Sequence, residues 1–252
     1  MNLGGLVGNT PLIKLADKLY AKFETYNPSG SIKARIGYFI IKRAEQRGDL
    51  QPGDTIVEAT SGNTGIATAM FGANMGYRVM IVMPCNMSNE RKQMMRLFGA
   101  EVIEVDAGDF DGAIAMRDKI CQAPGFFNFN QFHNPDNIAC HYETTGVEIL
   151  NQTEGMDIAA FLDGTGTGGT LMGVSARLKE KYPTVKTLAI EPAESPVMSG
   201  GEPGLHGIQG IGDGSKFLVD LDKVDEVLLV KTDDAIKRMK QLHQRGLLVG
   251  IS

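Results

Sequence analysis

The sequence predicts an α/β fold of two domains, each with three layers around a mostly parallel sheet. Strand-like and helix-like segments alternate through most of the 252 residues. Several strand-like segments are almost continuously apolar, as in YRVMIVM at 77–83. Such strands are typical of parallel sheets that helices cover on both faces. The length is sufficient for one large domain or two smaller ones.

Each expected element follows from a local pattern. Strands are expected where β-branched and other apolar residues cluster, and helices where apolar residues recur at helical spacing. The expected strands are 12–15, 19–24, 55–59, 77–83, 101–105, 126–130, 157–162, 186–191 and 225–230. The expected helices are the segment after Ser31, 65–75, 88–99, 109–121, 137–150, 170–181 and 233–245, with a glycine-rich irregular run at 195–214.

Two places look short for this pattern. Only Ala16, Asp17 and Lys18 separate the strand-like segments 12–15 and 19–24. The last residues, GLLVGIS, read as a strand with no helix after it. Either the chain is short at these places, or residues near 15–19 and after Ser252 are absent from the sequence.

Composition excludes several classes of protein. The 25 Lys and Arg against 30 Asp and Glu give a net charge of −5, so no basic footprint indicates nucleic acid. We find no apolar run long enough to span a bilayer and no signal peptide. Cys85, Cys121 and Cys140 are odd in number and lack metal-ligand spacing, as do the four histidines. We expect no metal site and free thiols in the cytoplasm.

One lysine stands at an unusual place. In NPSGSIKARIGYFI, a turn precedes Lys33, and the expected helix follows with Ser31 as its cap. The positive end of a helix dipole disfavours a cation at this position. A solvated lysine is the simplest interpretation. The alternative is an amine kept partly neutral, so that it acts as a nucleophile or a base.

A glycine loop at 164–169, GTGTGG, follows an expected strand and opens an expected helix. It satisfies the dinucleotide motif, and Glu191 follows at a strand end where a ribose-binding acid would lie. Taken alone, the loop predicts an NAD-dependent oxidoreductase. However, glycines at a helix start favour any phosphate, so the loop predicts a phosphate without naming its owner. A tight turn without a ligand is the other alternative.

A second loop, EATSGNTG at 58–65, also joins a strand end to a helix. Thr60, Ser61 and Asn63 offer polar side chains, and two glycines allow the backbone to come close. This combination suits a small carboxylate held by N–H groups and hydroxyls. The number of polar and glycine residues in this loop exceeds what capping one helix requires.

Six segments, in order, resemble a known family. NPSGSIK, EATSGNTG, QFHNPDN, GTGTGGT, GIQGIGDG and GLLVGIS resemble the fold-type II pyridoxal-phosphate enzymes, and among them the cysteine synthases (O-acetylserine sulfhydrylases) and the related cystathionine β-synthases. The resemblance covers nearly the whole chain and implies a fold like that of the tryptophan synthase β subunit. It further implies a smaller mobile domain at 35–129, and a larger domain at 1–34 plus 130–252.

The resemblance assigns a role to each matching residue. Lys33 would hold the pyridoxal phosphate covalently, Asn63 would bind the ring 3′-oxygen, and Ser252 would face the pyridine nitrogen. The phosphate would be surrounded by Gly166, Thr167, Gly168, Gly169 and Thr170. The substrate would be bound by Thr60, Ser61, Thr64 and Gln131 at its carboxylate and lined by Gly210, Ile211 and Gly212.

The implied reaction is a β-replacement. A lysine that removes the substrate's α-proton must be neutral, and a helix start in a dry pocket favours this. A neutral hydroxyl at Ser252 gives a weaker electron sink than an acid would, which suits the loss of a β-leaving group. The expected reaction converts O-acetyl-L-serine and sulfide to L-cysteine and acetate.

Two positions depart from the family pattern. Ala34 stands where an acid is typical, with little expected consequence. Asp213 stands where a small residue is typical, close to the amino-acid site. It is either a solvated loop aspartate or a carboxylate that orients or deprotonates a water. The second interpretation suits a hydrogen-sulfide-releasing cysteine lyase, which takes L-cysteine and water to L-serine and sulfide.

The resemblance also suggests partners. It implies a homodimer and, as in some relatives, docking of a serine acetyltransferase C-terminal tail. A non-catalytic protein that keeps the fold as an interaction scaffold is the remaining alternative.

Overall fold

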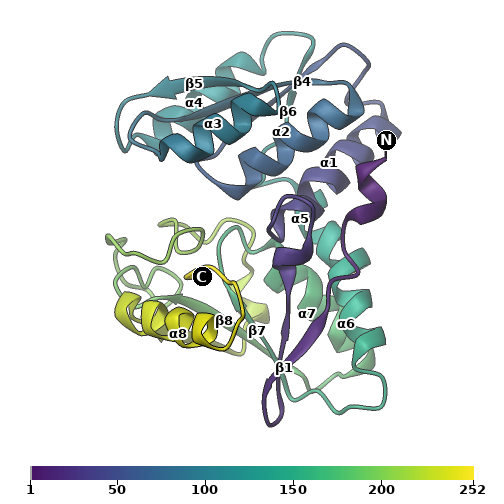
Figure 1. Cartoon of the computed structure of the whole chain (residues 1–252), viewed down its shortest axis with the longest axis vertical. Helices are drawn as coiled ribbons and strands as arrows, with labels where there is room; N and C mark the ends of the chain where they lie inside the picture. Colours follow the sequence, from purple (N-terminus) through teal and green to yellow (C-terminus); the bar gives the residue numbers. More distant parts are fainter. Residues whose placement is uncertain (1) are drawn as a thin grey trace. The chain divides into compact units, whose positions relative to one another are not determined.

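The computed structural model describes residues 2–252 and divides the chain into two compact units (Figure 1). Unit 1 comprises Met1–Pro11 and Tyr26–Asp136, and unit 2 comprises Leu12–Thr25 and Asn137–Ser252. Each unit contains a parallel sheet with helices packed on it, so the predicted α/β fold with mostly parallel sheets is confirmed. The expected mobile domain at 35–129 concerns motion, and it stays a prediction.

The sheet of unit 1 has four parallel strands in the order β5-β4-β3-β6. They are β3 (Thr55–Ala59), β4 (Arg78–Pro84), β5 (Glu101–Val105) and β6 (Phe126–Asn128). Every residue of β3 is buried, in keeping with its central place. The carboxyl end of β3 leads directly into the 60–64 loop, at the edge where parallel sheets bind ligands.

Four long helices accompany this sheet. They are α1 (Lys33–Arg47), α2 (Asn63–Met75), α3 (Asn89–Leu97) and α4 (Phe110–Ile120), and the 3-10 turns η1 (Leu3–Leu6) and η2 (Glu24–Tyr26) precede them. The side chains of Ser88 and Asp109 cap α3 and α4. Ala113 of α4 packs with Val57 and Val82 of the sheet, so α4 covers one of its faces.

Helices α1 and α2 lie side by side and run in the same direction (Figure 1). Near their starts, a Cβ built on Gly37 would lie 2.9 Å from the Cβ of Ala67. Near their ends, Tyr77 donates a hydrogen bond of 2.9 Å to Glu45. The two helices therefore begin at the same end of unit 1. The predicted site residues Lys33 and Asn63, the first residues of α1 and α2, lie at that end.

The sheet of unit 2 has three parallel strands in the order β7-β8-β9. The elements are β7 (Ala160–Gly164), α7 (Gly169–Lys181), β8 (Lys186–Pro192), η4 (Leu221–Lys223), β9 (Glu226–Val230) and α8 (Thr232–Gln244). Leu171 and Met172 of α7 pack against Ala189 of the sheet. The strand expected at 157–162 begins later, at Ala160, and extends to Gly164.

An antiparallel hairpin precedes these elements in unit 2. Its strands are β1 (Leu12–Ala16) and β2 (Leu19–Lys22). Asp17 and Lys18 form the turn between them, and Lys18 takes a left-handed conformation (φ +55°). A tight turn therefore accounts for the short connection that the sequence shows here.

The single helix expected at 137–150 was wrong in detail. The structure has α5 (Pro135–Cys140), a π-helical turn η3 (His141–Thr145) and α6 (Gly146–Gln152). The hydroxyl of Thr144 donates to the carbonyl oxygen of Cys140 at 2.7 Å, so a side chain competes with the backbone ladder. The wider turn has no periodicity signal that distinguishes it from an α-helix, and such turns occur frequently at functional sites.

Within residues 2–252, no helix has both the length and the apolar character needed to cross a membrane. The same residues contain no cluster of three or more His, Cys, Asp or Glu side chains arranged to hold a metal ion.

Candidate active site

Lys33 is the first residue of α1. Its backbone N–H donates to the hydroxyl of Ser31 at 3.3 Å. The N-cap position itself is Ile32, which has no capping side chain, so the expected cap lies one residue too early. The turn before it closes through a hydrogen bond of 2.8 Å from the Gly30 N–H to the Asn27 carbonyl, and Gly30 has the positive φ (+73°) that such a turn favours. The sequence thus fixes Lys33 at a helix start.

The 60–64 loop joins β3 to α2. Its first residue, Thr60, extends the sheet by donating its N–H to the carbonyl of Val82 at 3.1 Å. Gly62 occupies the N-cap position of α2 and supplies no capping side chain. The N–H groups of the first helical turn therefore suit an anion. Arg91 of α3 donates to the carbonyl oxygen of Ser61 at 3.4 Å and supports the loop from outside.

Gln131 lies against this loop. The Thr64 hydroxyl donates to the side-chain oxygen of Gln131 at 2.7 Å, and both residues are buried. The two predicted carboxylate ligands are 67 residues apart in sequence, yet the fold brings them into contact. Lys33, Asn63, Thr64 and Gln131 thus all belong to unit 1.

A buried acid beneath the loop was missed in the sequence. Glu58 of β3 is fully buried, and its carboxylate accepts from the Gln131 N–H at 2.9 Å and from the Arg117 guanidinium at 3.4 Å. Burial raises the pKa of the Glu58 carboxyl to about 7, and the nearby Arg117 charge opposes the rise. The sequence signal that could have identified Glu58 is the presence of an acid in the otherwise apolar strand TIVEA.

The 164–170 loop opens α7 in unit 2. Gly168 is the N-cap, has φ +88° and provides no capping side chain. A Cβ on Gly168 would lie 2.6 Å from a methyl carbon of Val219, and a Cβ on Gly166 would lie 2.7 Å from the carbonyl oxygen of Gly210. Side chains are excluded at these positions, and the backbone N–H groups at the start of α7 remain directed beyond the helix end.

Two buried side chains support this loop from behind. Asn137 donates to the Thr167 hydroxyl at 3.0 Å. The ring of His141 lies 2.9 Å from the Thr145 hydroxyl through Nδ1 and 3.3 Å from the Thr170 hydroxyl through Nε2. Nothing in the sequence pattern linked either residue to the glycine loop.

The expected substrate-lining turn also belongs to unit 2. Gly212 donates its N–H to the carbonyl of Thr165 at 3.2 Å, which joins the 210–212 turn to the glycine loop. A Cβ on Gly210 would lie 4.0 Å from the hydroxyl oxygen of Ser252. Ile211 is buried beside them, and Asp213 is exposed in the same turn.

Glu191 has a structural partner in the next turn. Its carboxylate accepts from the Met198 N–H at 2.8 Å and from the N–H and hydroxyl of Ser199 at 2.9 and 2.7 Å. The acid that completes the dinucleotide motif in the sequence therefore anchors the chain after β8.

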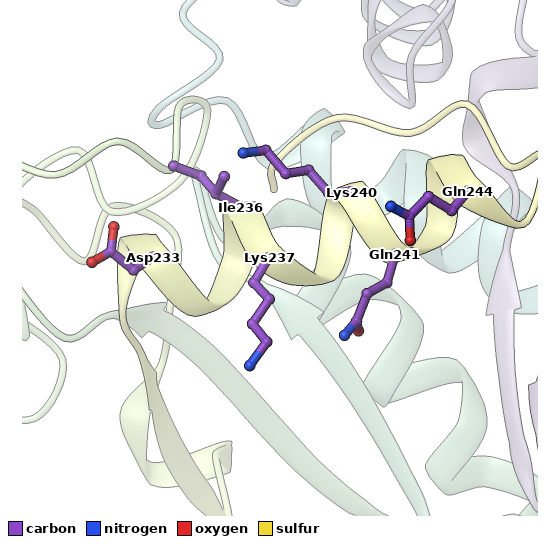
Figure 2. A pocket seen from close by; sticks show the side chains of 6 residues that line it. All are labelled: Asp233, Ile236, Lys237, Lys240, Gln241 and Gln244. Atoms are coloured by element: carbon purple, nitrogen blue, oxygen red, sulfur yellow. The ribbon is translucent and has the colours of Figure 1, made fainter.

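A surface pocket along α8 contains none of the predicted site residues (Figure 2). Its lining consists of Asp233, Ile236, Lys237, Lys240, Gln241 and Gln244. These side chains project from the outside of one helix, without glycines or buried polar groups, and nothing in their arrangement indicates catalysis.

The predicted residues fit the chemistry of pyridoxal phosphate. A glycine cradle at an uncapped helix start suits its phosphate. A lysine supplies the amine that pyridoxal-phosphate enzymes require. A hydroxyl, Ser252, and an amide, Asn63, are suitable partners for the polar atoms of the ring.

Comparisons with known proteins agree with this chemistry. The family model described as pyridoxal-phosphate dependent enzyme matches residues 3–252. A cysteine synthase of Staphylococcus aureus is 43% identical, and the match covers 100% of this chain and 84% of that protein.

Solved structures give the same result. A cysteine synthase from Entamoeba histolytica has a TM-score of 0.94 at 39% identity, covering 99% of this chain and 78% of that one. A hydrogen sulfide-producing enzyme from Fusobacterium nucleatum has a TM-score of 0.95 at 41% identity, covering 99% and 79%. The chain therefore belongs to the family of pyridoxal-phosphate dependent enzymes.

Proposed function

We propose that this chain catalyses a β-replacement on an activated serine or cysteine, as a cysteine synthase that converts O-acetyl-L-serine and sulfide to L-cysteine and acetate. The observation that carries the proposal is the 43% identity, over the whole chain, to a cysteine synthase. Two anion-binding loops at helix starts support it, since the cofactor and the substrate each bring an anionic group.

The proposed cofactor-binding residues follow from the resemblance. Lys33 would hold it covalently through Nζ, the 166–170 segment would bind its phosphate, and Asn63 and Ser252 would face its ring. When bound, pyridoxal phosphate withdraws electrons from the substrate's α-carbon. The bonds from Asn137 and His141 to the hydroxyls of the phosphate segment support this assignment.

Lys33 is the proposed base. It would take the proton from the substrate Cα and return it after replacement, which requires the neutral amine. Its place in the first turn of α1 disfavours the charged form, because the positive end of the helix dipole lies there. In the net reaction the Cβ–O bond to acetate breaks, and a Cβ–S bond to sulfide forms.

Substrate orientation is assigned to the 60–64 loop and Gln131. Thr60 and Ser61 would donate to the substrate carboxylate together with the first N–H groups of α2, including that of Thr64. The hydrogen bond from Thr64 to Gln131 supports one shared binding site. The turn of Gly210, Ile211 and Gly212 would also line the amino acid.

A second candidate activity is release of hydrogen sulfide from L-cysteine. Asp213 is exposed in the proposed substrate-lining turn, and a neighbour with 41% identity is a hydrogen sulfide-producing enzyme. In this alternative Asp213 would orient or deprotonate the water that adds to Cβ, and serine would leave. A cystathionine β-synthase type of activity uses the same residues with another thiol.

Further assignments follow from the family. We propose a homodimer and a mobile 35–129 domain. A cytoplasmic location and docking of a serine acetyltransferase tail stay predictions.

The test is a comparison of substrates on the purified enzyme. Turnover of O-acetyl-L-serine with sulfide, faster than sulfide release from L-cysteine, supports the cysteine synthase. The reverse preference would establish the lyase. A protein that binds pyridoxal phosphate but converts no amino acid would contradict both and support the scaffold alternative. Binding of NAD without a visible cofactor band would support the oxidoreductase.

A further inference from the structure

We propose that Glu58 is a positioning residue, which holds Gln131 and the 60–64 loop in the arrangement that receives the substrate carboxylate. The inference rests on the proposed function, because it concerns the substrate of that same site. Glu58 itself lies beneath the loop, and it acts through its neighbours.

The carboxylate of Glu58 joins two segments of the chain. Its Oε1 accepts from the Ala59 N–H at 2.7 Å, directly before the loop begins. Its Oε2 accepts from the Gln131 N–H at 2.9 Å, across 73 residues of sequence. Both bonds are buried. One side chain therefore fixes the backbone at the two places from which the proposed carboxylate ligands project.

Glu58 anchors the segment that carries Gln131. The preceding residue, Asn130, takes a left-handed conformation (φ +50°), in which asparagine is enriched among residues other than glycine. The chain turns here from β6 towards α5, and the N–H groups of His133 and Asn134 donate to the Asn130 carbonyl at 3.1 and 2.9 Å. The bond to Glu58 closes this turn onto β3.

Charge compensation for Glu58 comes from α4. Arg117 is 2% exposed, and its Nη1 lies 3.4 Å from Oε1 of Glu58. The Nε and Nη2 atoms of Arg117 donate to Asp118 at 3.0 and 2.8 Å. Asp118 also accepts from Asn128 of β6 at 3.0 Å. The Arg117 charge favours the ionised carboxylate against the effect of burial, and an ionised carboxylate accepts stronger hydrogen bonds from N–H groups.

The fold alone does not need an acid at this position. The neighbours of Glu58 on β3 include Ile56 and Val57, and the strand ladders to β4 and β6 use backbone groups only. Apolar side chains in place of both Glu58 and Arg117 would fill the same space without a desolvation penalty, and such replacements of whole buried ion pairs are often neutral or stabilising. The bonds to Ala59 and Gln131 give the acid a role that an apolar residue lacks.

The experiment compares three variants of the cofactor-loaded enzyme. Glu58→Gln keeps the shape but turns one acceptor into a donor. Glu58→Asp keeps the charge but is one methylene too short to retain both bonds. Ile81→Ala is the control, because Ile81 is the direct ladder partner of Glu58 on β4 and is fully buried. It destabilises unit 1 through a cavity without altering the proposed carboxylate site.

We expect Glu58→Gln to raise the KM for O-acetyl-L-serine about tenfold, because the hydrogen bonds that hold the carboxylate-binding residues in place are weakened. The kcat at saturation changes less than the KM, and the visible spectrum of the bound cofactor is unchanged. Glu58→Asp raises the KM by a smaller factor. Exchange of the Gln131 amide hydrogen accelerates in both variants, and Ile81→Ala lowers the Tm with the KM at the wild-type value.

The outcomes separate this inference from the proposed function. Wild-type enzyme that does not turn over O-acetyl-L-serine would overturn both. Active wild-type enzyme with an unchanged KM in Glu58→Asp, or with an equal KM increase in Ile81→Ala, would overturn the positioning role alone. If Glu58→Gln does not fold, Glu58→Asp decides the result through its KM and its Gln131 exchange rate.

Discussion

The imidazole Nε2 of His141 lies 3.3 Å from the hydroxyl oxygen of Thr170, the second residue of α7. The same ring meets Thr145 through Nδ1 at 2.9 Å, inside the π-helical turn. A buried ring that is bound at both nitrogens orients the hydroxyl at the start of α7. This contact links the irregular helical turn to the proposed phosphate site.

We predict that His141→Ala weakens binding of pyridoxal phosphate. Loss of one hydrogen bond reduces the binding free energy by about 1 kcal/mol, which corresponds to an increase of roughly fivefold to tenfold in the dissociation constant. Titration of the apoenzyme with pyridoxal phosphate, followed by absorbance, measures the change. His133→Ala is the matched control, since His133 is exposed and belongs to unit 1. Equal affinity in both variants and the wild type would show that the His141 contact does not support the site.

A second prediction concerns the backbone of the glycine loop. Gly168→Ala places a Cβ at φ +88°, 2.6 Å from a Val219 methyl carbon and 2.9 Å from the Val219 nitrogen. Gly155→Ala is the control, because Gly155 has φ +79° with no atom within 4 Å of the added Cβ. We expect the left-handed conformation to cost about 1 kcal/mol in both variants. The steric contact adds about 1–3 kcal/mol in Gly168→Ala.

Urea denaturation of the two variants gives the free energies of unfolding. Only Gly168→Ala should also weaken cofactor binding, since the start of α7 must shift to relieve the contact. Equal losses of stability in Gly155→Ala and Gly168→Ala would contradict the close packing of the loop.

The pH dependence of stability is a third prediction, and it follows from Glu58. Its pKa rises from 4.5 to about 7 on folding because of burial. The folded state therefore holds this proton more tightly than the unfolded state. The stabilising contribution of the protonated group is fully present below pH 4.5, and it is lost as the pH rises to about 7. The difference amounts to about 3 kcal/mol.

The neighbouring charges should not mask this effect. Asp118 is exposed at half of its side-chain surface, and burial raises the pKa of the Cys121 thiol to about 11. Unfolding of the wild type and of Glu58→Gln, measured between pH 5 and pH 8, should give curves that diverge through this range. Parallel curves would show that Glu58 does not titrate there.

Asp213 provides the fourth prediction. If its carboxylate acts on the water that adds to Cβ, Asp213→Asn should reduce sulfide release from L-cysteine at least about tenfold, within the range of general base catalysis. Synthesis of L-cysteine from O-acetyl-L-serine needs no such water and should change little. Sulfide electrode measurements with both substrates test this pair of expectations. Unchanged sulfide release in the variant would make Asp213 a solvated loop residue.

Most of the fold was predictable from local patterns. The apolar run at 77–83 and the glycine-bounded loops at 60–64 and 164–170 are contiguous, and the structure places strands and helix starts there. In the structure, a π-helical turn divides the helix expected at 137–150. The sequence did not predict this turn, because a hydrogen bond from Thr144 to a backbone carbonyl leaves no periodic signal.

The site was predictable only in part. Motifs indicated the residues that would contact ligands, because their types are specific for phosphate and carboxylate groups. Glu58, Asn137 and His141 act through contacts between distant segments, such as the 73 residues that separate Glu58 from Gln131. Local spacing contains no information on such pairs, so the supporting layer of the site required the structure.

The central claim is that the amine of Lys33 carries the cofactor. The most direct measurement is reduction of the purified enzyme with borohydride, followed by proteolysis and mass spectrometry. We predict that pyridoxal phosphate becomes fixed to the peptide that contains Lys33, and that Lys33→Ala loses both this adduct and the visible absorption band. Attachment to another lysine, or an enzyme that turns over O-acetyl-L-serine without any adduct at Lys33, would contradict the account.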